Sequence, residues 1–196
     1  MSRLDLVVGP NGAGKSTFVE RFIIPHRPGV PFVNADLIAA RLWPAAQAEH
    51  GYDAAARAAA TRDALIERAD EFIAETVFSH ASKLDLLDRA GRAGYRVHLW
   101  VVMVPVELSV LRVRARVAAG GHDVPELKVR ERHARSWGHV VEAVPTVAVA
   151  RFWDNSSRRG PRRIAAYYDG VADGPVRWPS WVDPRLPERL GGSIVR

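Results

Sequence analysis

One stretch decides the fold of this chain: Gly9-Pro10-Asn11-Gly12-Ala13-Gly14-Lys15-Ser16. A short apolar run at 4–8 precedes it, as in a buried parallel strand, and the pattern after it predicts a helix over about 15–24. A glycine-rich turn between a strand and a helix directs backbone N–H groups toward an anion at the helix N-terminus. The stretch therefore predicts a phosphate-binding loop, and its flanking segments argue against a chance glycine-rich turn.

The side chains of this loop fit a nucleoside triphosphate and its metal ion. The Lys15 ammonium group would reach the β- and γ-phosphates, and the Ser16 hydroxyl would be a ligand of the Mg²⁺ ion that bridges them. The cofactors expected from the sequence are therefore ATP and Mg²⁺. The residues expected to bind the nucleotide are Gly9, Pro10, Asn11, Gly12, Ala13, Gly14, Lys15, Ser16 and Thr17.

Predicted strands and helices alternate along the chain. The expected strands are 4–8, 31–36, 70–75, 95–105 and 147–152. The most apolar of them is 95–105, which we expect at the centre of the sheet. The expected helices are 15–24, a segment that ends near Pro44, 53–69, 82–93, 106–118 and 124–135. This alternation is typical of βα units, so the predicted fold class is α/β: a P-loop NTPase three-layer sandwich with a mainly parallel sheet and a helical lid.

The composition excludes several classes of protein. Hydrophobic residues make up 47% of the chain and charged residues 26%, which excludes disordered, collagen-like and coiled-coil architectures. The chain has no cysteine, so disulfide scaffolds, thiolate zinc sites and cysteine nucleophiles are excluded, and nothing demands an oxidising compartment. No apolar run approaches the about 18 residues of a membrane span. We therefore expect a soluble, cytoplasmic protein with no membrane partner.

The length of 196 residues favours a single domain with an appendage. We expect a P-loop domain at 1–170 and a C-terminal appendage, rich in Pro and Trp, at 171–196. Lys and Arg number 28 against 22 Asp and Glu, which gives a net charge of +6. This charge attracts anions such as nucleotides, nucleic acid or phosphorylated sugars and does not select one of them.

Two carboxylates stand where expected strands end. Asp36 lies at the C-terminal edge of the second strand, and Glu75 ends the third. Because the carboxyl ends of parallel strands open on one crevice, we expect both beside the phosphate loop. The chain lacks the Asn-Lys-x-Asp segment that reads guanine and the Leu-Ser-Gly-Gly-Gln element of transporter ATPases, so a small-molecule kinase is favoured. Two alternatives stay open: Asp36 as the N-cap of a helix over 37–42, and Glu75 as a cap or the partner of an arginine.

Further motifs carry a resemblance to a known family. The most distinctive is Gly120-Gly121-His122-Asp123-Val124-Pro125, and Asp154-Asn155-Ser156 closes the similar region, which covers roughly residues 3–157. The other matching segments are 9–18, 33–39, 72–76, 94–97 and 112–117. In these segments the chain resembles the zeta toxins and the zeta-toxin-like P-loop kinases.

The resemblance implies roles for individual residues. Asp36 would be the general base that deprotonates a substrate hydroxyl, and Asn34, Glu75 and Thr76 would bind the substrate with it. Two lid arginines, Arg116 and Arg132, would neutralise the charge that develops on the γ-phosphate during transfer.

The assignment of the lid residues leaves alternatives open. Arg130 and Arg135 are near neighbours that could replace the two chosen arginines, and a solvated basic helix face is the other interpretation of any one of them. His122 would either help to position the lid or only form a turn. His133 stands where many relatives carry Tyr, which leaves the packing of adenine or of the lid at this position open.

The function implied is transfer of phosphate from ATP to a hydroxyl group of a small molecule. By the resemblance, the acceptor would be a UDP-activated amino sugar such as UDP-N-acetylglucosamine, and the protein would be the toxin of a pair with an antitoxin protein as partner. Two other functions remain: a slow ATPase, and an ATP-binding regulatory module that acts on nucleic acid or protein through the basic stretches 112–135 and 158–163. Of these we expect the kinase, without a nucleic-acid partner.

Overall fold

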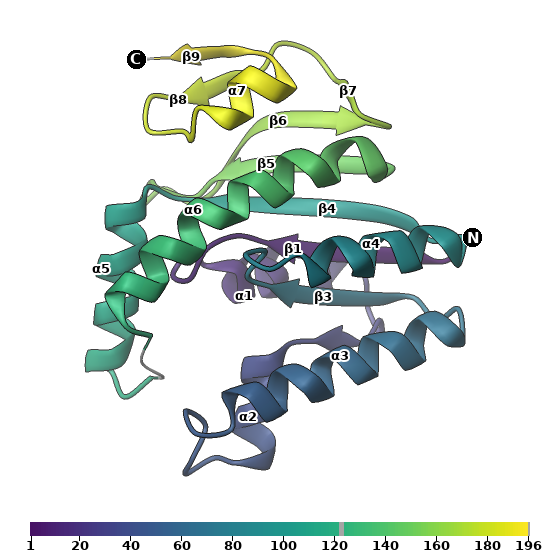
Figure 1. Cartoon of the computed structure of the whole chain (residues 1–196), viewed down its shortest axis with the longest axis vertical. Coiled ribbons are helices and arrows are strands. Elements are labelled where there is room, and N and C mark those ends of the chain that lie inside the picture. Colours follow the sequence, from purple (N-terminus) through teal and green to yellow (C-terminus); the bar gives the residue numbers. More distant parts are fainter. Residues whose placement is uncertain (122–123, 196) are drawn as a thin grey trace.

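A seven-stranded sheet forms the middle layer of the protein (Figure 1). The computed structural model describes residues 1–121 and 124–195. The sheet order is β2-β3-β1-β4-β5-β6-β7, in which the first five strands run parallel and the last two join antiparallel. The strands are β1 Arg3–Val8, β2 Phe32–Val33, β3 Phe72–Thr76, β4 Arg96–Met103, β5 Val149–Asp154, β6 Arg162–Tyr168 and β7 Val171–Ala172. Strand β4 lies in the middle, which confirms its predicted central position.

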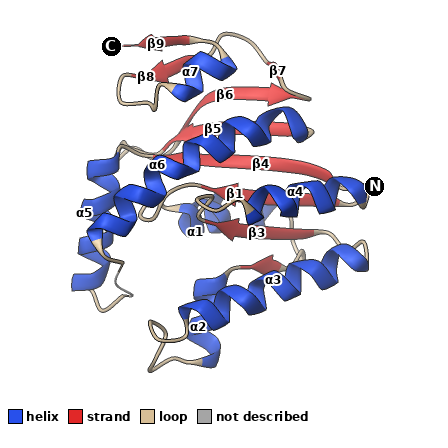
Figure 2. Cartoon of the chain, viewed as in Figure 1, coloured by secondary structure: helices blue, strands red, loops and turns tan. Residues whose placement is uncertain are grey.

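Helices cover both faces of the sheet (Figure 2). The face called the front here carries α2 Ala35–Leu42, α3 Gly51–Glu67, α4 Ser82–Arg92 and α6 Glu126–Ala143. The back carries α1 Lys15–Phe18, the π-helical turn Val19–Ile23 and the 3-10 turn Ile24–His26. Helix α5, Val106–Ala118, stands at the edge where the parallel strands end. These three layers confirm the predicted fold class. Within the described residues, none of the helices is both long and apolar enough to cross a bilayer.

The sheet is anchored on both faces because the side chains of its strands alternate between two apolar layers. In β1, Leu4 and Leu6 face the front helices, whereas Val7 packs at the back with Phe18. These four side chains are at most 2% exposed. Full burial of such a side chain is worth about 1.5–3 kcal/mol, so burial on both faces fixes the strands whose ends carry the polar residues.

Three predicted elements differ from the structure. The helix expected over 124–135 continues without a break to Ala143, and the second strand is only two residues long because Asn34 already caps α2. The helix expected over 15–24 begins as an α-helix and changes to π-helical winding at Val19.

The C-terminal part adds elements that the sequence pattern did not predict. Strand β6 begins with two exposed arginines and buries only 164–167, so its apolar run is short. The last elements are β8 Arg177–Pro179, α7 Arg185–Leu190 and β9 Ser193–Val195. Trp178 and Leu186 are 0% exposed and belong to the front core. The described part of the appendage, residues 171–195, therefore packs buried side chains into the same core as the residues before it.

Candidate active site

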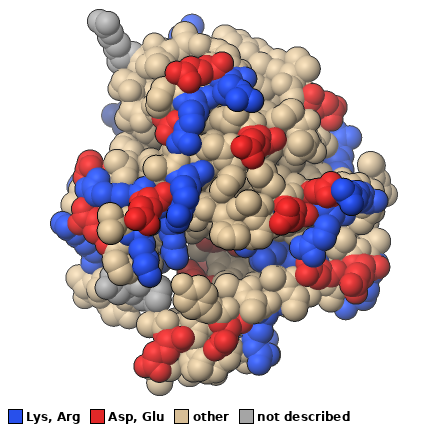
Figure 3. All heavy atoms as spheres, in the orientation of Figure 1, with Lys and Arg blue, Asp and Glu red and all other residues tan. Residues whose placement is uncertain are grey.

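The polar residues singled out in the sequence gather at the edge where the parallel strands end. The phosphate loop follows β1, Asn34 follows β2, and Glu75 and Thr76 end β3. The strand register aligns Val8 with Thr76. Figure 3 shows the surface hollowed between α2 and the α5–α6 pair, with acidic atoms in the hollow and basic side chains on the α5–α6 rim. This edge of the sheet is the candidate active site.

The backbone of the phosphate loop has a shape that glycine makes possible. Gly14 has a φ of 83°, in the left-handed region, directly before the first residue of α1. Gly9 passes so close to β4 that a Cβ atom there would lie 2.2 Å from the carbonyl oxygen of Val102. Helix α1 thus starts at the loop, where its free N–H groups face an incoming phosphate.

Three residues that the sequence did not single out for the site hold the loop from outside. The Ser109 hydroxyl donates to the Asn11 carbonyl oxygen. The Arg112 guanidinium donates to the carbonyl oxygen of Asn155 at 3.0 Å, and the Asn155 amide donates to that of Ala13 at 2.7 Å. The missed signal was positional: Asn155 directly follows a parallel strand, and the other two lie one turn apart on the helix that follows β4.

Lys15 lies buried inside the loop. Its Nζ donates to the carbonyl oxygen of Pro10 at 3.0 Å and lies 3.9 Å from Oε1 of Glu75. Burial lowers the pKa of the Lys15 ammonium, the negative charges of Glu75 and Asp36 oppose that change, and the positive charge of Arg116 adds to it. The lysine is therefore within electrostatic reach of all three residues.

Glu75 connects the phosphate loop to the second strand. Its side chain is 9% exposed, and its Oε2 accepts a hydrogen bond of 2.7 Å from the Asn34 amide. Burial raises the pKa of Glu75, whereas the charge of Lys15 and hydrogen bonds from Ser16 and Asn34 lower it, and the charge of Asp36 raises it further. Four predicted site residues thus meet this one carboxylate.

Asp36 is not the N-cap of α2, so the capping alternative is wrong. Asn34 is the cap: its Oδ1 accepts the backbone N–H of Asp36 at 2.7 Å and that of Leu37 at 3.3 Å. One amide side chain therefore starts the helix with its oxygen and holds Glu75 with its nitrogen. The Asp36 carboxylate is left exposed in the first turn, where its charge acts on Lys15 and Glu75.

The lid arginines differ in what they touch. Arg116 acts on Lys15 from α5. Arg132 is half-buried on α6, and among the described residues the hydrogen bonds that join the lid to the phosphate loop come from α5 and not from it. Arg130 is engaged elsewhere, with guanidinium nitrogens 2.7 Å from Glu107 and 2.9 Å from Glu126.

The remaining predicted residues have ordinary structural surroundings. Thr17 is exposed and Thr76 is half-buried. His133 accepts a hydrogen bond at Nδ1 from the Trp137 indole and lies 2.9 Å from the Val104 carbonyl oxygen through Nε2, so it joins α6 to the end of β4. Burial lowers its pKa, which favours the neutral ring that this arrangement needs. His122 lies outside the described residues.

A family model described as an AAA domain matches residues 4–136 of this chain. No curated protein matches the sequence. The chain is similar to a solved AvrRxo1-ORF1:-ORF2 complex with ATP, at 17% identity and a TM-score of 0.70, covering 98% of this chain and 64% of that chain. It therefore spans less than two thirds of that protein.

Two further solved structures share the fold. One comes from the PezAT chromosomal toxin-antitoxin system of Streptococcus pneumoniae, at 12% identity and a TM-score of 0.63, covering 84% of this chain and 72% of that chain. The other is shikimate kinase from Acinetobacter baumannii in complex with shikimate, at 19% identity and a TM-score of 0.52, covering 82% of this chain and 86% of that chain. These likenesses show a P-loop kinase-like fold.

Proposed function

This chain belongs to the AAA domain family, and we propose that it is an ATP-dependent phosphotransferase that acts on a hydroxyl group of a small molecule. One observation carries the proposal: the buried phosphate-loop Lys15 lies within electrostatic reach of two carboxylates, Glu75 and Asp36, that come from different strand ends. A nucleotide bound on the loop would meet an acceptor held by these carboxylates. Shikimate kinase, a kinase of the same fold, supports this function.

In the proposed reaction, Asp36 accepts the proton of the acceptor hydroxyl. The freed oxygen forms a bond to the γ-phosphorus, and the bond between that phosphorus and the bridging oxygen of ADP breaks. Lys15, Arg116 and Arg132 neutralise the charge on the transferred group. Asn34 and Glu75 orient the acceptor, with Thr76 beside them. Most of the rate comes from positioning and charge neutralisation in this scheme.

The residues around Lys15 also fit a Mg²⁺ ion. The Ser16 hydroxyl contacts the Glu75 carboxylate, so two oxygen groups of the protein meet beside the phosphate loop. Mg²⁺ prefers oxygen ligands and commonly takes one or two from the protein, with the rest from phosphates and water. We assign Ser16 as the protein ligand. The ion would neutralise negative charge on the β- and γ-phosphates when bound.

We further propose a UDP-activated amino sugar as the acceptor and an antitoxin protein as a partner. The resemblance to the zeta toxins supports the first. The similarity to a protein from a toxin-antitoxin system supports the second, through the fold. Expression of the chain from a tight promoter should arrest growth of the host, and Asp36→Asn should relieve the arrest. Normal growth at full expression of active enzyme would contradict the toxin role.

The test of the enzyme is an acceptor screen with ATP labelled at the γ-phosphate. Hydroxyl-bearing metabolites, UDP-N-acetylglucosamine first among them, are incubated with the protein and Mg²⁺. We expect one class to be phosphorylated, and Asp36→Asn to lower turnover by ~10²–10⁴-fold while ATP still binds, since a positioned base contributes about that factor.

The matched control is Asp88→Asn, an exposed carboxylate on α4 that pairs with Arg92 at 3.0 Å. It should leave turnover unchanged. Binding of ATP without phosphorylation of any acceptor would favour the regulatory module, and ATP hydrolysis that no acceptor stimulates would favour the slow ATPase. An Asp36→Asn variant with full activity would refute the assignment of the base.

A further inference from the structure

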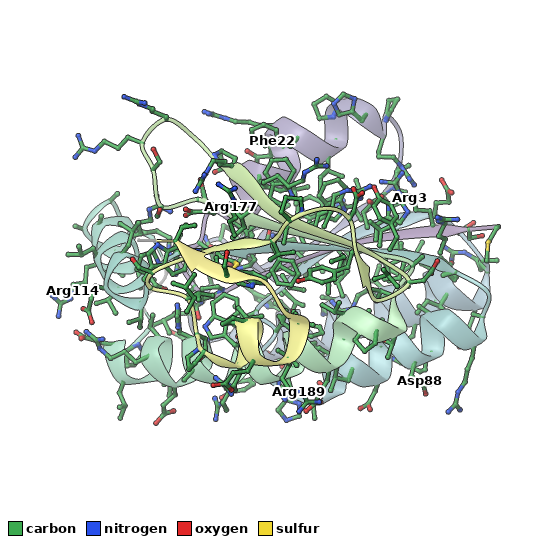
Figure 4. All side chains as sticks on the ribbon, turned by 90° about the horizontal axis from the view of Figure 1, so that it is seen from above. Arg3, Phe22, Asp88, Arg114, Arg177 and Arg189 are labelled. Carbon is green, nitrogen blue, oxygen red and sulfur yellow. The ribbon has the colours of Figure 1, made fainter. Side chains whose placement is uncertain are left out.

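The back of the sheet carries a row of planar side chains that the proposed phosphotransfer does not use. We call Phe22, Trp153, Trp100, Arg151 and Tyr168 the aromatic strip. Phe22 comes from the π-helical turn, and the others come from β4, β5 and β6. In the view of Figure 4, Phe22 lies on one side of the sheet and Asp88 of helix α4 on the other. The strip therefore lies on the face that α3, α4 and α6 leave open.

The members of the strip contact one another in sequence across the sheet. The ring of Phe22 lies 6.3 Å from that of Trp153, which stacks at 6.5 Å on Trp100. The Arg151 guanidinium then lies over Trp100 at 4.9 Å and over Tyr168 at 5.8 Å. Four rings and a planar cation thus form one continuous row.

The strip is open to solvent. Phe22 is 39% and Tyr168 38% exposed, and the other three side chains are half-buried. Large aromatic groups gathered on an open face are a sign of a binding surface. Nothing in the front-face chemistry requires them here.

Arginines lie beside the Trp153 end of the strip, whereas the Asp5 carboxylate, which accepts the Trp100 indole N–H at 2.9 Å, is 0% exposed and paired with arginines. Arg163 stands opposite Trp153 in the β5–β6 pairing, so both side chains belong to the back face. The connection 155–161 between these two strands contains two arginines and no acidic residue, and β6 begins with two more arginines. The carboxylate of Asp154, the residue before this connection, is already engaged: it accepts a hydrogen bond of 2.9 Å from the backbone N–H of Ser156 and lies 3.9 Å from the Arg162 guanidinium. The charge beside the strip therefore complements a polyanion.

We propose that the aromatic strip and the arginines beside it bind single-stranded nucleic acid. Unpaired bases stack on aromatic rings and on guanidinium planes, and arginines bind the phosphates between them. An acidic peptide would match the charge but would leave the row of flat faces without planar partners. A duplex would hide its bases from the strip. In the sequence, nucleic acid was one of several anions that the basic charge could attract, but no pattern marked the strip, because its five residues come from four elements that only the fold brings together.

The test uses fluorescence anisotropy with a fluorescein-labelled oligothymidylate of ~12 nucleotides, within the about 4–16 nucleotides that such surfaces cover. At a low salt concentration of ~50 mM the protein should bind with a Kd below ~100 µM. Tyr168→Ala and Arg151→Gln should each weaken binding roughly tenfold, since each removes a stacking surface. Arg163→Gln should lower the slope of log affinity against log salt by about 0.7, the value for one phosphate contact.

The matched control is Arg92→Gln, which removes an exposed arginine from α4 on the front face, where its guanidinium lies 3.0 Å from Asp88. It should bind the oligonucleotide as the unmodified protein does. A second control is excess ATP, which should not displace the oligonucleotide, because among the described residues the side-chain hydrogen bonds to the phosphate loop involve no member of the strip. Trp100 and Trp153 meet Ala13 of the loop through the buried apolar cluster beneath the strip.

Four results would overturn the proposal. They are no binding at low salt, an equal loss for Arg92→Gln and the strip variants, displacement of the oligonucleotide by ATP, and equally tight, strip-dependent binding of a polyglutamate peptide. The third would place the nucleic acid in the nucleotide cleft, and the fourth would make the strip a docking surface for an acidic protein. Circular dichroism of each variant confirms that the fold is intact. None of these results depends on the phosphotransferase activity, so the two proposals fail separately.

Discussion

The phosphate loop and the helical lid lie side by side, yet they are held by different forces. The loop is fixed by buried and partly buried hydrogen bonds, among them the buried bond of 3.0 Å from Lys15 to the Pro10 carbonyl oxygen and the partly buried bond of 2.7 Å from Asn155 to the Ala13 carbonyl oxygen. The two lid helices, α5 and α6, are joined over a small apolar cluster by exposed ion pairs, in which Glu126 binds both Arg114 and Arg130. Exposed ion pairs contribute about 0–1 kcal/mol, and a buried polar group left without its partner costs about 1–3 kcal/mol.

This difference matches what each region does in the proposed reaction. A loop that must receive three phosphates works best when its N–H groups are already in place, because no free energy is then spent on ordering it. A lid must admit the nucleotide and then bring its arginines to the γ-phosphate, which requires a weakly held contact. Substitutions in the loop should therefore have large effects and substitutions in the lid ion pairs small ones.

The largest effect is expected from Gly9→Ala. The added methyl group would lie 2.2 Å from the Val102 carbonyl oxygen, at a φ of +154°, so β1 and β4 would have to separate. Strain of about 1–3 kcal/mol and overpacking of about 1–3 kcal/mol predict a loss of roughly 2–6 kcal/mol in the free energy of unfolding. Urea denaturation measures it, and loss of ATP binding should accompany it.

The variant Gly29→Ala is the control for Gly9→Ala, because it tests the cost of the backbone conformation without the cost of a steric clash. Gly29 has a φ of +78°, but a Cβ atom there would meet nothing within 4 Å. It should lose only the roughly 1–2 kcal/mol of the left-handed conformation. Equal losses for the two variants would show that the contact with β4 does not matter.

A smaller effect is expected from Asn155→Ala, which removes the hydrogen bond to the phosphate loop and leaves the Ala13 carbonyl oxygen without it. The loop should lose part of its order, and the Kd for ATP should rise roughly tenfold, the equivalent of about 1.4 kcal/mol. Isothermal titration calorimetry measures it. Ser156→Ala, in the next residue, is the control and should bind ATP normally; an unchanged Kd for Asn155→Ala would mean that the loop keeps its shape alone.

The features that could be predicted from the sequence are those fixed by neighbouring residues in the chain. The phosphate loop was predictable because its glycines, Lys15 and Ser16 are neighbours in the chain and each has a local reason to be there. The sheet followed from apolar runs of strand length, and β4 was recognised as central because its run is the most apolar of them.

What the sequence did not reveal depends on distant residues or on a choice between neighbours. Ser109 and Arg112 support the loop across 98 and 100 positions, and no local pattern marks such a pair. The cap of α2 was assigned to Asp36 as one alternative, although Asn34 is the cap, because both residue types cap helices and only the backbone decides. Strand β6 was not predicted because its apolar run is short: it begins with two exposed arginines and buries only residues 164–167.

Glu75 gives a pH-dependent test of how tightly the acceptor side of the site is packed. Burial raises the pKa of its carboxyl in the folded protein above the ordinary value. A group with a raised pKa stabilises the fold fully below its unfolded pKa of about 4.3, and this stabilisation is lost as the pH rises through the folded pKa. Relative to Glu75→Gln, which cannot titrate, the unmodified protein should therefore gain stability on acidification.

The gain should grow as the pH falls toward the unfolded pKa of about 4.3, and each pKa unit of the rise corresponds to about 1.4 kcal/mol of it. Urea denaturation of both proteins without nucleotide, at each pH, measures the difference. The control is Glu71→Gln, which removes a carboxylate that is 46% exposed and pairs with Arg27 at 2.9 Å. The unmodified protein should not gain stability on acidification relative to this variant. A difference that falls on acidification would mean that Lys15 and the hydrogen bonds outweigh burial at Glu75.

The smallest effect is expected from Arg130→Gln. Arg130 binds Glu107 at 2.7 Å and Glu126 at 2.9 Å on the outside of the lid, where solvent screens the charges. The melting temperature should stay within about 2 °C of that of the unmodified protein, and turnover should stay within about twofold. The same substitution at Arg116, whose charge acts on Lys15, should lower turnover strongly. If Arg130→Gln instead abolished turnover, Arg130 would be a lid arginine that leaves Glu107 and Glu126 to reach the γ-phosphate. The ion pairs of the lid would then be part of the catalytic cycle and not only a weak contact between its helices.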